Sequence, residues 1–490
     1  MKWQNNFEKR KNGAPVLLRA GALLHKVMNM NVNDSLEYMR TGLPEDILQR
    51  KLHGDYEGAV RLIDKRLKEN NLSDALRGSL LVQKKICQEL PGEFPYSKED
   101  AMAIIRKDIP DFTEAEFEEL VDQRNIRWIY INGEEHYSTR FYDSLCKAVP
   151  EFGKRARQQM GGMESVTTDS CTVDLRNVTM AKMKEQGELT TRIRVRATIK
   201  LKDEFFTPGM FLRVHLPVPA ACDQQQDIRI EKVWPEGGMI APETAGQRTV
   251  CWQENLPENQ EFMVEYSYLH TAKYQDAYNG TGIAGTYDFD VQEQEPHIVF
   301  SPYIQSLCAE LTEGITDPLR KARAFYDFIT KNMYYTYMPE YITLESLAEN
   351  CARNYTGDCG IFALLFLTLC RCAGIPAQWQ SGLAVEPDYI GGHDWVRFYV
   401  EPYGWIFADA SYGVSSMRAE NEERRQFYFG NLDPYRMVAN SAFQMNFTIP
   451  KEQWRADPYD NQRGEMESAD RGYSFSAMEQ NQTILLCEEV

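Results

Sequence analysis

The stretch Asn354–Pro376, NYTGDCGIFALLFLTLCRCAGIP, carries the strongest structural signal in the chain. Cys359 directly precedes a run of apolar residues that is long enough for about four helical turns. Gly374 and the proline that follows it are stop signals, because glycine accommodates a helix C-cap and proline cannot continue a helix. The pattern therefore predicts a buried helix that begins at Cys359.

The position of Cys359 at a helix start bears on its reactivity. The positive end of the helix dipole and the unpaired backbone N–H groups favour a thiolate, so we expect the pKa of the Cys359 thiol to be lowered. The same geometry makes the Cys359 backbone N–H a candidate oxyanion donor. The flanking residues Asp358 and Gly360 are candidates for the substrate cleft, where glycine leaves room for a substrate carbonyl.

A thiolate nucleophile needs a base, most often a histidine, and of the seven histidines in the chain only His393 follows Cys359. His393 stands in GGHDWVRFYVEPYGWIFADASYG, residues 391–413. Alternating residues there predict a strand, Pro-Tyr-Gly predicts a turn, and the return strand ends at Asp409. Gly392, which allows access to the imidazole, and Trp395 are the candidate cleft residues on this strand.

Whether Asp409 reaches His393 depends on the register of this hairpin. In the simplest pairing Asp409 lies opposite Val396, on the wrong face of the sheet. One extra residue in the loop, or a bulge, moves Asp409 opposite Trp395, a diagonal neighbour of His393 on the same face, and we expect such an irregularity. Asp394 points to the other side of the strand, which makes it a poor substitute for Asp409.

Taken singly, each of these residues has an ordinary structural explanation. A cysteine before an apolar helix is commonly a core residue, and a histidine on a strand is commonly a packed or hydrogen-bonded one. The combination is more specific, because Cys359, His393 and Asp409 supply a nucleophile, a base and a carboxylate that orients the base. Together they indicate a catalytic triad of the cysteine type.

At these residues the chain resembles the transglutaminase-like superfamily, whose core reads G-x-C, a helix ending in AGIPA, H-x-W-V on a strand, and GW-x-x-x-D. The matching segments are Gly357–Cys359, Ala373–Ala377, His393–Val396 and Gly404–Asp409. The resemblance implies a papain-like α+β catalytic core. It also implies that Cys359 is the nucleophile, His393 the base and acid, and Asp409 the residue that orients His393.

The chain departs from the family pattern in two places. Relatives that cross-link proteins usually place a tryptophan upstream of the cysteine to support the oxyanion, and no tryptophan lies between Trp252 and Cys359. Tyr335 and Tyr337 are the candidates to take that role. Asp394 stands where the family often has a small residue, so the charge of the cleft differs. The calcium requirement of animal transglutaminases is not carried over, because no ligand set is recognisable.

The 490 residues predict about three domains of an α+β protein. Apolar residues at helical spacing predict a mainly helical domain over residues 1–162, and alternation of apolar and polar residues predicts a β-sandwich over 163–292. The transglutaminase-like catalytic domain is expected at 293–450. Residues 451–490 are expected to form a C-terminal tail.

Composition narrows the partners and the compartment. The net charge, 54 − 72 = −18, opposes binding to a phosphate backbone, so we expect no nucleic-acid partner. No segment reaches the ~20 apolar residues that span a bilayer, so we expect no membrane partner. The absence of a signal-peptide pattern and the 11 scattered cysteines favour reduced thiols and a cytoplasmic protein. The oligomeric state stays open.

No cofactor and no metal is expected. GTGIAG at 280–285 spells a dinucleotide-binding pattern, but a proline-containing segment without helical period follows it. The chain has no Walker loop, no HExxH motif and no CxxC pair, so metal binding is not supported.

The leading hypothesis is a cysteine-dependent amide hydrolase or acyltransferase, with a cysteine peptidase as one form of it. Cys359 would attack an amide carbonyl of a peptide or protein substrate, form a thioester, and pass the acyl group to water or to an amine. We favour water, because no residues point to the solvent exclusion that a cross-linking enzyme needs. The alternative is a catalytically inactive transglutaminase-like scaffold that binds a peptide or a polysaccharide.

Overall fold

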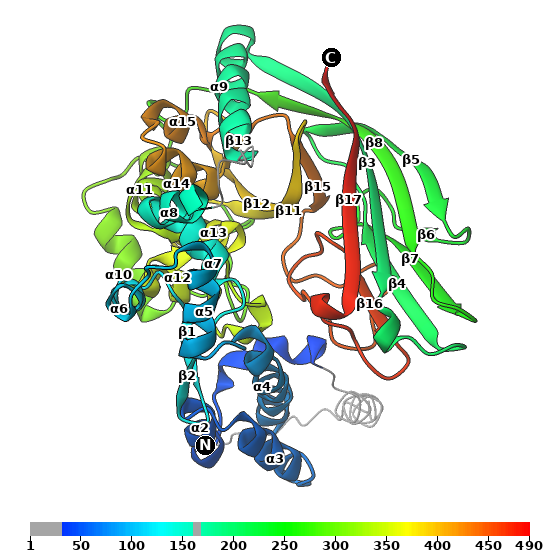
Figure 1. Cartoon of the computed structure of the whole chain (residues 1–490). Coiled ribbons are helices and arrows are strands. Elements are labelled where there is room, and N and C mark those ends of the chain that lie inside the picture. The colour runs from blue at the N-terminus through cyan, green and yellow to red at the C-terminus, as the bar shows by residue number, and fades with distance from the viewer. Residues whose placement is uncertain (1–31, 160–167) are drawn as a thin grey trace, which may run out of the picture.

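The computed structural model describes residues 32–159 and 168–490, in which a helical part, a mixed part and a sandwich lie side by side (Figure 1). The elements of the helical part are η1 (Asn33–Thr41), α2 (Glu45–Leu52), α3 (Tyr56–Arg66), α4 (Asp74–Glu93), α5 (Lys98–Asp108), α6 (Glu114–Asp122), β1 (Trp128–Ile131), β2 (Glu134–Tyr137), α7 (Phe141–Ala148) and α8 (Pro150–Gln159).

The helical part contains two packing units. Helices α2 to α4 share one apolar core with the mixed part, and Ile129 and Ile131 of β1 pack against it. Helices α5 to α8 and Tyr137, at the end of β2, enclose a separate core. In that separate core the rings of Phe117 and Tyr137 meet edge to face at 4.9 Å. The hairpin turns at Asn132 and Gly133, which both have positive φ, as a two-residue type I′ turn requires.

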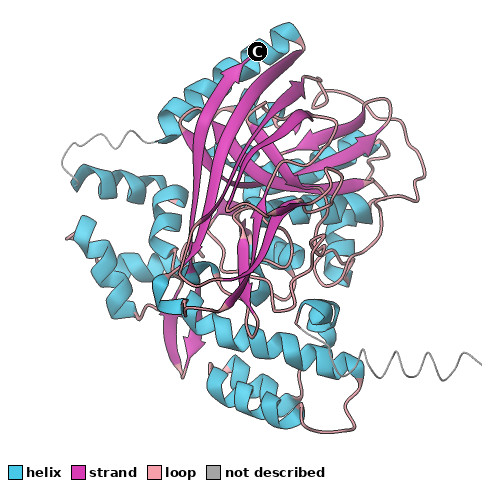
Figure 2. Ribbon diagram, turned by 90° about the vertical axis from the view of Figure 1, so that its right-hand side faces the viewer, coloured by secondary structure: helices cyan, strands magenta, loops and turns pink. Residues whose placement is uncertain are grey.

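The sandwich consists of two four-stranded antiparallel sheets, β17-β3-β8-β5 and β16-β4-β7-β6. Along β3, buried and solvent-facing residues alternate, because Ile193 and Val195 face the apolar core while the arginines between them face outward. The long strands run together along the molecule (Figure 2). The strands are β3 (Glu188–Leu201), β4 (Phe211–Pro217), β5 (Gln225–Trp234), β6 (Met239–Ile240), β7 (Thr249–Asn255), β8 (Phe262–Lys273), β16 (Glu465–Ser468) and β17 (Met478–Glu489), with the short helix η2 (Asp203–Phe205) after β3.

The C-terminal segment is not a tail, which corrects the sequence interpretation of residues 451–490. Strand β16 pairs with β4, and β17 pairs with β3 from Met478 opposite Leu201 to Glu489 opposite Thr191. Figure 1 shows β17 running beside β3, so segments far apart in sequence close one sandwich. The physical reason is that β3 would otherwise be a long edge strand with unpaired backbone groups.

A second correction concerns the start of the β-rich region. Residues 168–186 form a helix, α9 (Thr168–Gln186), rather than part of the sandwich. Its Arg176 donates to Glu386 Oε1 at 2.5 Å and to the Tyr412 hydroxyl at 3.1 Å, so α9 is tied to the mixed part. The strand pattern begins only at Glu188.

The mixed part is built around a five-stranded sheet in the order β14-β13-β12-β11-β15. Helix α13 packs on one face of this sheet, where Phe366 meets Phe398 at 5.4 Å, and residues 360–370 are all buried. The elements are α10 (Pro302–Leu311), α11 (Pro318–Asn332), β9 (Tyr334–Tyr335), η3 (Tyr341–Thr343), α12 (Leu347–Asn354), β10 (Thr356–Gly357), α13 (Cys359–Cys372), β11 (Ala377–Glu386), β12 (Tyr389–Val400), β13 (Gly404–Ala408), α14 (Ala410–Arg418), α15 (Glu422–Phe427), β14 (Phe429–Gly430) and β15 (Arg436–Asn440), and the last helical element, η4 (Phe475–Ala477), precedes β17.

This arrangement confirms the expected fold class, an α+β chain of several parts. Within residues 32–159 and 168–490, no helix combines the length and the apolar character needed to cross a bilayer.

Truncation of the chain after Ala477 tests the structural role of β17. We expect the midpoint of thermal unfolding to fall by at least ~10 °C, because the loss of a full strand costs several kcal/mol and each kcal/mol corresponds to about 2–4 °C in a chain of this kind. Circular dichroism on heating measures the midpoint. Truncation after Cys487, which removes only exposed residues, is the control and should change the midpoint little. Equal midpoints for the two truncations would contradict the role of β17.

Candidate active site

Cys359 is the first residue of α13, as the sequence predicted. The N-cap is Asp358, whose carboxylate accepts from the Ile361 backbone N–H at 3.2 Å and from the Tyr341 hydroxyl. Just before it, β10 pairs in parallel with β9, with Gly357 opposite Tyr335. The thiol therefore stands at a capped helix N-terminus, half-buried beside the tyrosine-rich segment.

His393 and Asp409 are in direct contact and both are buried. The imidazole Nε2 and the Asp409 Oδ2 are 2.7 Å apart. Asp409 is also the N-cap of α14, where its Oδ1 accepts from the Tyr412 backbone N–H at 2.8 Å, and its Oδ2 accepts from Arg436 Nη1 at 2.8 Å. The imidazole is thus held in one orientation, with Nδ1 left to exchange a proton with another group.

The electrostatics of this pair follow from burial and charge. Burial alone would raise the pKa of Asp409, but the neighbouring His393 and Arg436 outweigh it and leave the pKa below its usual value. Burial lowers the pKa of His393, and Asp409 opposes that shift. Asp409 is therefore a stable carboxylate that can orient the imidazole and stabilise its protonated form.

The hairpin has the register that brings Asp409 to His393. This register comes from a shorter loop and not from the predicted extra residue or bulge. Val396 pairs with Ala408 and Val400 pairs with Gly404, which puts Asp409 opposite Trp395. The loop, residues 401–403, is one residue shorter than in the simplest pairing, and the ladder between β12 and β13 is regular. The expected extra residue or bulge is absent from this hairpin; Gly404, at φ +71°, permits the tighter turn.

Asp394 lies beside the nucleophile. The sequence analysis did not predict this position, because it considered Asp394 only as a poor substitute for Asp409. Asp394 lies close enough to Cys359 for its carboxylate to raise the pKa of the thiol. The alternation of β12 explains this proximity, since Asp394 shares a face with Phe398, and α13 packs on that face. Among the described residues no hydrogen bond joins the thiol to His393. Of the three triad candidates, therefore, only His393 and Asp409 are joined by a hydrogen bond in the described part of the chain.

The expected lowering of the thiol pKa is wrong for this arrangement. Burial raises the pKa of Cys359 well above its usual value, and the carboxylates of Asp394 and Asp358 raise it further. Lys147 on α7 acts in the opposite direction. The helix N-terminus favours a thiolate, but two carboxylates at close range outweigh a partial charge of about half a unit.

Tyr335 and Tyr337, the oxyanion candidates, lie at different distances from the nucleophile. Tyr335 is buried, and the pKa of its phenol is raised by burial and by the neighbouring Cys359. The Lys147 ammonium lies 3.8 Å from the centre of the Tyr335 ring, and Arg140 lies 3.4 Å from the centre of the Tyr337 ring. Tyr335 therefore belongs to the surroundings of the thiol, whereas Tyr337 mainly contacts α7.

The candidate cleft residues have different positions as well. Asp358 is the N-cap of α13, so its carboxylate already has hydrogen-bond partners. A Cβ added at Gly360 would lie 2.3 Å from the Tyr341 hydroxyl, and one added at Gly392 would lie 2.2 Å from Gln462 Oε1, so both glycines allow close packing. Trp395 is wrong as a cleft residue, because it is fully buried and its indole N–H donates to Gln380 Oε1 at 2.8 Å.

Several residues of the site escaped the sequence analysis. Arg436 and Asp433 come from the segment after β14, where Arg436 Nη2 donates to Asp433 Oδ2 at 2.6 Å. The Tyr412 ring lies 4.5 Å from the His393 ring. Lys147 comes from the helical part. FGNLDPYRM, residues 429–437, looks like a flanking part of bacterial members of the superfamily, and this resemblance was the available signal for Arg436.

One segment of the chain matches a known protein family. Residues 305–410 match the model of the transglutaminase-like superfamily. The chain contains a transglutaminase-like domain. The uncharacterized protein YebA of Bacillus subtilis is 24% identical over 132 residues, a stretch that spans 23% of this chain and 18% of YebA.

Two solved structures resemble larger parts of this chain. A candidate cysteine protease from Cytophaga hutchinsonii is 16% identical, covers 62% of this chain and 91% of its own, and has a TM-score of 0.41. The periplasmic domain of TgpA from Pseudomonas aeruginosa is 15% identical, covers 51% and 96% of the two chains, and has a TM-score of 0.26. Both TM-scores lie below 0.5, so the chemistry of this transglutaminase-like site has to be argued from its own geometry.

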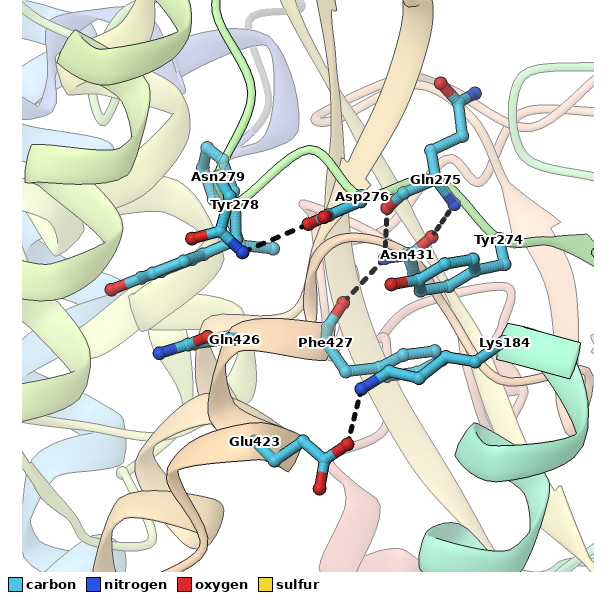
Figure 3. A pocket seen from close by; sticks show the side chains of 11 residues that line it. Lys184, Tyr274, Gln275, Asp276, Tyr278, Asn279, Glu423, Gln426, Phe427 and Asn431 are labelled. Carbon is cyan, nitrogen blue, oxygen red and sulfur yellow. Dashed lines mark hydrogen bonds and ion pairs between the residues drawn. The ribbon is translucent and has the colours of Figure 1, made fainter.

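A separate pocket lies between α9, α15 and residues 274–279, with a volume of about 170 Å³ (Figure 3). Figure 3 shows Lys184 paired with Glu423, at 2.6 Å, and Asn431 bonded to the backbone of Gln275. The pocket contains no nucleophile, and these polar groups already have partners. Within the described part of the chain, no cluster of three His, Cys, Asp or Glu residues is arranged to hold a metal ion.

Proposed function

We propose that the transglutaminase-like domain is a thiol-dependent enzyme that hydrolyses an amide bond of a peptide or protein. The observation that carries the proposal is the buried His393–Asp409–Arg436 chain in the same domain as a cysteine at a helix N-terminus. A fully buried, charged network of this kind is costly to maintain for packing alone, and it supplies an oriented base that precedes Asp394, whose carboxylate affects the Cys359 thiol.

The first half of the reaction forms a thioester. The Cys359 thiol gives its proton to Nδ1 of His393. The sulfur forms a bond to the amide carbonyl carbon, and the developing oxyanion accepts from the Cys359 backbone N–H. The C–N bond then breaks as the imidazolium returns the proton to the leaving amine.

The second half restores the enzyme. A water molecule gives a proton to His393, and its oxygen attacks the thioester carbonyl. The C–S bond breaks, the sulfur recovers the proton from the imidazolium, and the acid product leaves. Asp409 stays ionised throughout and stabilises the imidazolium in both halves.

The surroundings of Cys359 suit a peptide chain. The phenols of Tyr335, Tyr341 and Tyr389 all lie close enough to Cys359 for the cysteine to affect their pKa values, and Tyr389 is partly exposed. Lys147 lies over the Tyr335 ring. Aromatic rings provide apolar contact area and hydroxyl groups for a backbone, and Tyr335 is the proposed second support for the oxyanion.

The reaction product distinguishes hydrolysis from acyl transfer. Peptide and glutamine-donor libraries are incubated with the protein, with and without an excess of a primary amine, and analysed by mass spectrometry. We expect products that have gained one water in both reactions, with amine adducts as a minor species, because Cys359 is partly exposed. Amine adducts as the main product would contradict hydrolysis and favour cross-linking.

The catalytically inactive scaffold remains the second candidate, and one observation favours it. Burial and the carboxylates of Asp394 and Asp358 raise the pKa of the thiol, which is the opposite of a resting activated thiolate. A scaffold would bind the same peptides or a polysaccharide without converting them. Unchanged substrates after prolonged incubation, together with binding measured by calorimetry, would favour this function over hydrolysis.

A further inference from the structure

The Tyr412 ring lies against the His393 imidazole. The two ring centres are 4.5 Å apart and the ring planes are inclined by 32°. The hydrogen bond between His393 and Asp409 fixes one nitrogen of the imidazole, but a single hydrogen bond still allows the ring to tilt about it. A second contact on the ring itself removes that freedom. Tyr412 therefore affects the direction in which the other nitrogen, Nδ1, points.

Two guanidinium groups hold the Tyr412 ring in place. The central carbon of the Arg176 guanidinium lies 4.0 Å from the ring centre, and that of Arg436 lies 4.5 Å from it. The Tyr412 hydroxyl accepts from Arg176 Nη2 at 3.1 Å and donates to Glu386 Oε1 at 3.2 Å. The ring and the hydroxyl group are therefore both fixed.

Arg176 reaches this site from α9, and α9 is attached to the mixed part by polar contacts. Asn177, the next residue of the helix, accepts from Asn421 Nδ2 at 3.1 Å. Arg176 forms an ion pair with Glu386, which is only 1% exposed. A buried ion pair contributes little net stability, because both charges lose their hydration. The pair therefore fits a role in positioning better than a role in stability alone.

We propose that Tyr412 is a positioning residue for His393, and that Arg176 of α9 clamps the Tyr412 ring against the imidazole. The inference rests on the proposed role of His393 as the base of a thiol-dependent hydrolase. A base transfers a proton efficiently only when its nitrogen keeps the right direction. Helix α9 is then part of the catalytic unit, although it lies outside residues 305–410, the segment that matches the transglutaminase-like superfamily.

Burial is the largest effect on the pKa of His393 and lowers it. Tyr412 is 9% exposed, so its ring lies near the surface of the molecule. Removal of the ring should let water reach the imidazole and raise the pKa of His393 toward its ordinary value. The titratable and charged groups that face His393 and the Tyr412 ring are Asp409 at the N-cap of α14, Asp433 and Arg436 before and on β15, Tyr428 before β14, Glu386 on β11 and Arg176 on α9.

The test compares Tyr412→Ala with Tyr412→Phe in the full-length chain. His393 is titrated by NMR with isotope-labelled histidine, and its signal is identified by its absence from His393→Ala. We expect the pKa of His393 to rise in Tyr412→Ala and to stay near the wild-type value in Tyr412→Phe, which keeps the ring. On the best peptide from the library, kcat should fall at least ~10-fold in Tyr412→Ala with KM little changed, because the base is misdirected while substrate binding is not. In Tyr412→Phe, kcat should stay close to wild type.

Further variants separate positioning from loss of packing. Tyr266→Ala removes a buried ring from the sandwich core, so it should lower the midpoint of thermal unfolding and leave the His393 titration and kcat unchanged. Tyr412→Leu serves if Tyr412→Ala does not fold, and it should change both quantities in the same direction. The double variant Arg176→Met with Glu386→Gln removes the clamp without leaving a buried unpaired charge. It should raise the pKa of His393 and lower kcat, by less than Tyr412→Ala does.

The outcomes separate this inference from the proposed function. An unchanged His393 titration and unchanged kcat in Tyr412→Ala overturn the inference. Equal changes in Tyr412→Ala and Tyr412→Phe, or in Tyr412→Ala and Tyr266→Ala, also overturn it, because the ring then has no specific effect on His393. A wild-type titration in the double variant overturns the clamp by α9. A shifted titration in Tyr412→Ala without cleavage of any peptide by the wild type supports the hold on His393 while contradicting the proposed hydrolase.

Discussion

Cys359→Ala should lower peptide cleavage by at least ~10³-fold, to the background of the reaction without enzyme. The reason is chemical, since the proposed thioester cannot form without the sulfur atom. His393→Ala should have an effect of similar size, because the thiol then has no oriented group to accept its proton. Cys359→Ala should unfold at nearly the wild-type temperature, which circular dichroism measures, whereas His393→Ala should unfold at a lower temperature because it removes a buried partner of Asp409. Initial cleavage rates on the best peptide from the library give the loss.

The matched control for this series is Cys372→Ala. Cys372 is the last residue of the same helix and lies far from its N-terminus, so its loss should leave cleavage unchanged. Full activity of Cys359→Ala would exclude the proposed nucleophile. Full activity of His393→Ala would leave Cys359 in place but exclude His393 as the base.

Arg436→Met should destabilise the folded chain by about 3–5 kcal/mol, the usual cost of removing one partner from a buried ion pair. Arg436 is completely buried and donates to both Asp409 and Asp433, so its loss leaves two carboxylates without their cation. Cleavage should fall as well, because Asp409 then loses part of what keeps it ionised and aligned with His393. Denaturation in urea measures the change in free energy of unfolding.

The pH dependence of stability in this variant has a defined sign. In the wild type Arg436 lowers the pKa of both carboxyl groups, so their contribution to stability is present above the ordinary carboxyl pKa and is lost as the pH falls through the lower, folded-state value. Burial disfavours ionisation of the two carboxyl groups, and without Arg436 less positive charge offsets that effect. The pKa values of Asp409 and Asp433 then rise, and acid unfolding should begin at a higher pH than in the wild type.

Arg424→Met is the control for Arg436→Met. Arg424 is also buried, but it donates to Ser416 Oγ and Asn177 Oδ1 instead of to a carboxylate. Its removal loses hydrogen bonds without stranding a buried charge, so the destabilisation should be clearly smaller. Equal losses for the two variants would show that Arg436 acts through packing rather than through its charge.

Local patterns were sufficient for much of the catalytic core. The helix that begins at Cys359 is visible in the sequence, because an apolar run with its own stop signals specifies a buried helix whatever surrounds it. The two strands of the His393 hairpin follow from alternation, and the contact between His393 and Asp409 follows from a register in which they share a face. Only the length of the loop was misjudged.

Other features depended on which surfaces meet. The burial of Trp395 required knowing that its face of β12 is covered by Leu432 and Val438 from a later segment. The helix α9 has weak amphipathic patterning and was hidden beside the strong strand pattern of β3. Strand β17 looked like a tail because its partner, β3, is nearly 280 residues away in sequence, as the pair Met478 and Leu201 illustrates.

The sequence by itself determined the kinds of elements and the order in which the nucleophile, the histidine and the carboxylate appear, since these depend on side-chain periodicity and turn residues over short distances. The ionisation of the thiol was decided only by the tertiary structure. It depends on burial and on charges brought close by packing, and α13 lies on the face of the sheet that carries Asp394. Electrostatic interactions act through space. Residues distant along the chain therefore set the pKa of a cysteine whose motif could be recognised from two short segments of the sequence.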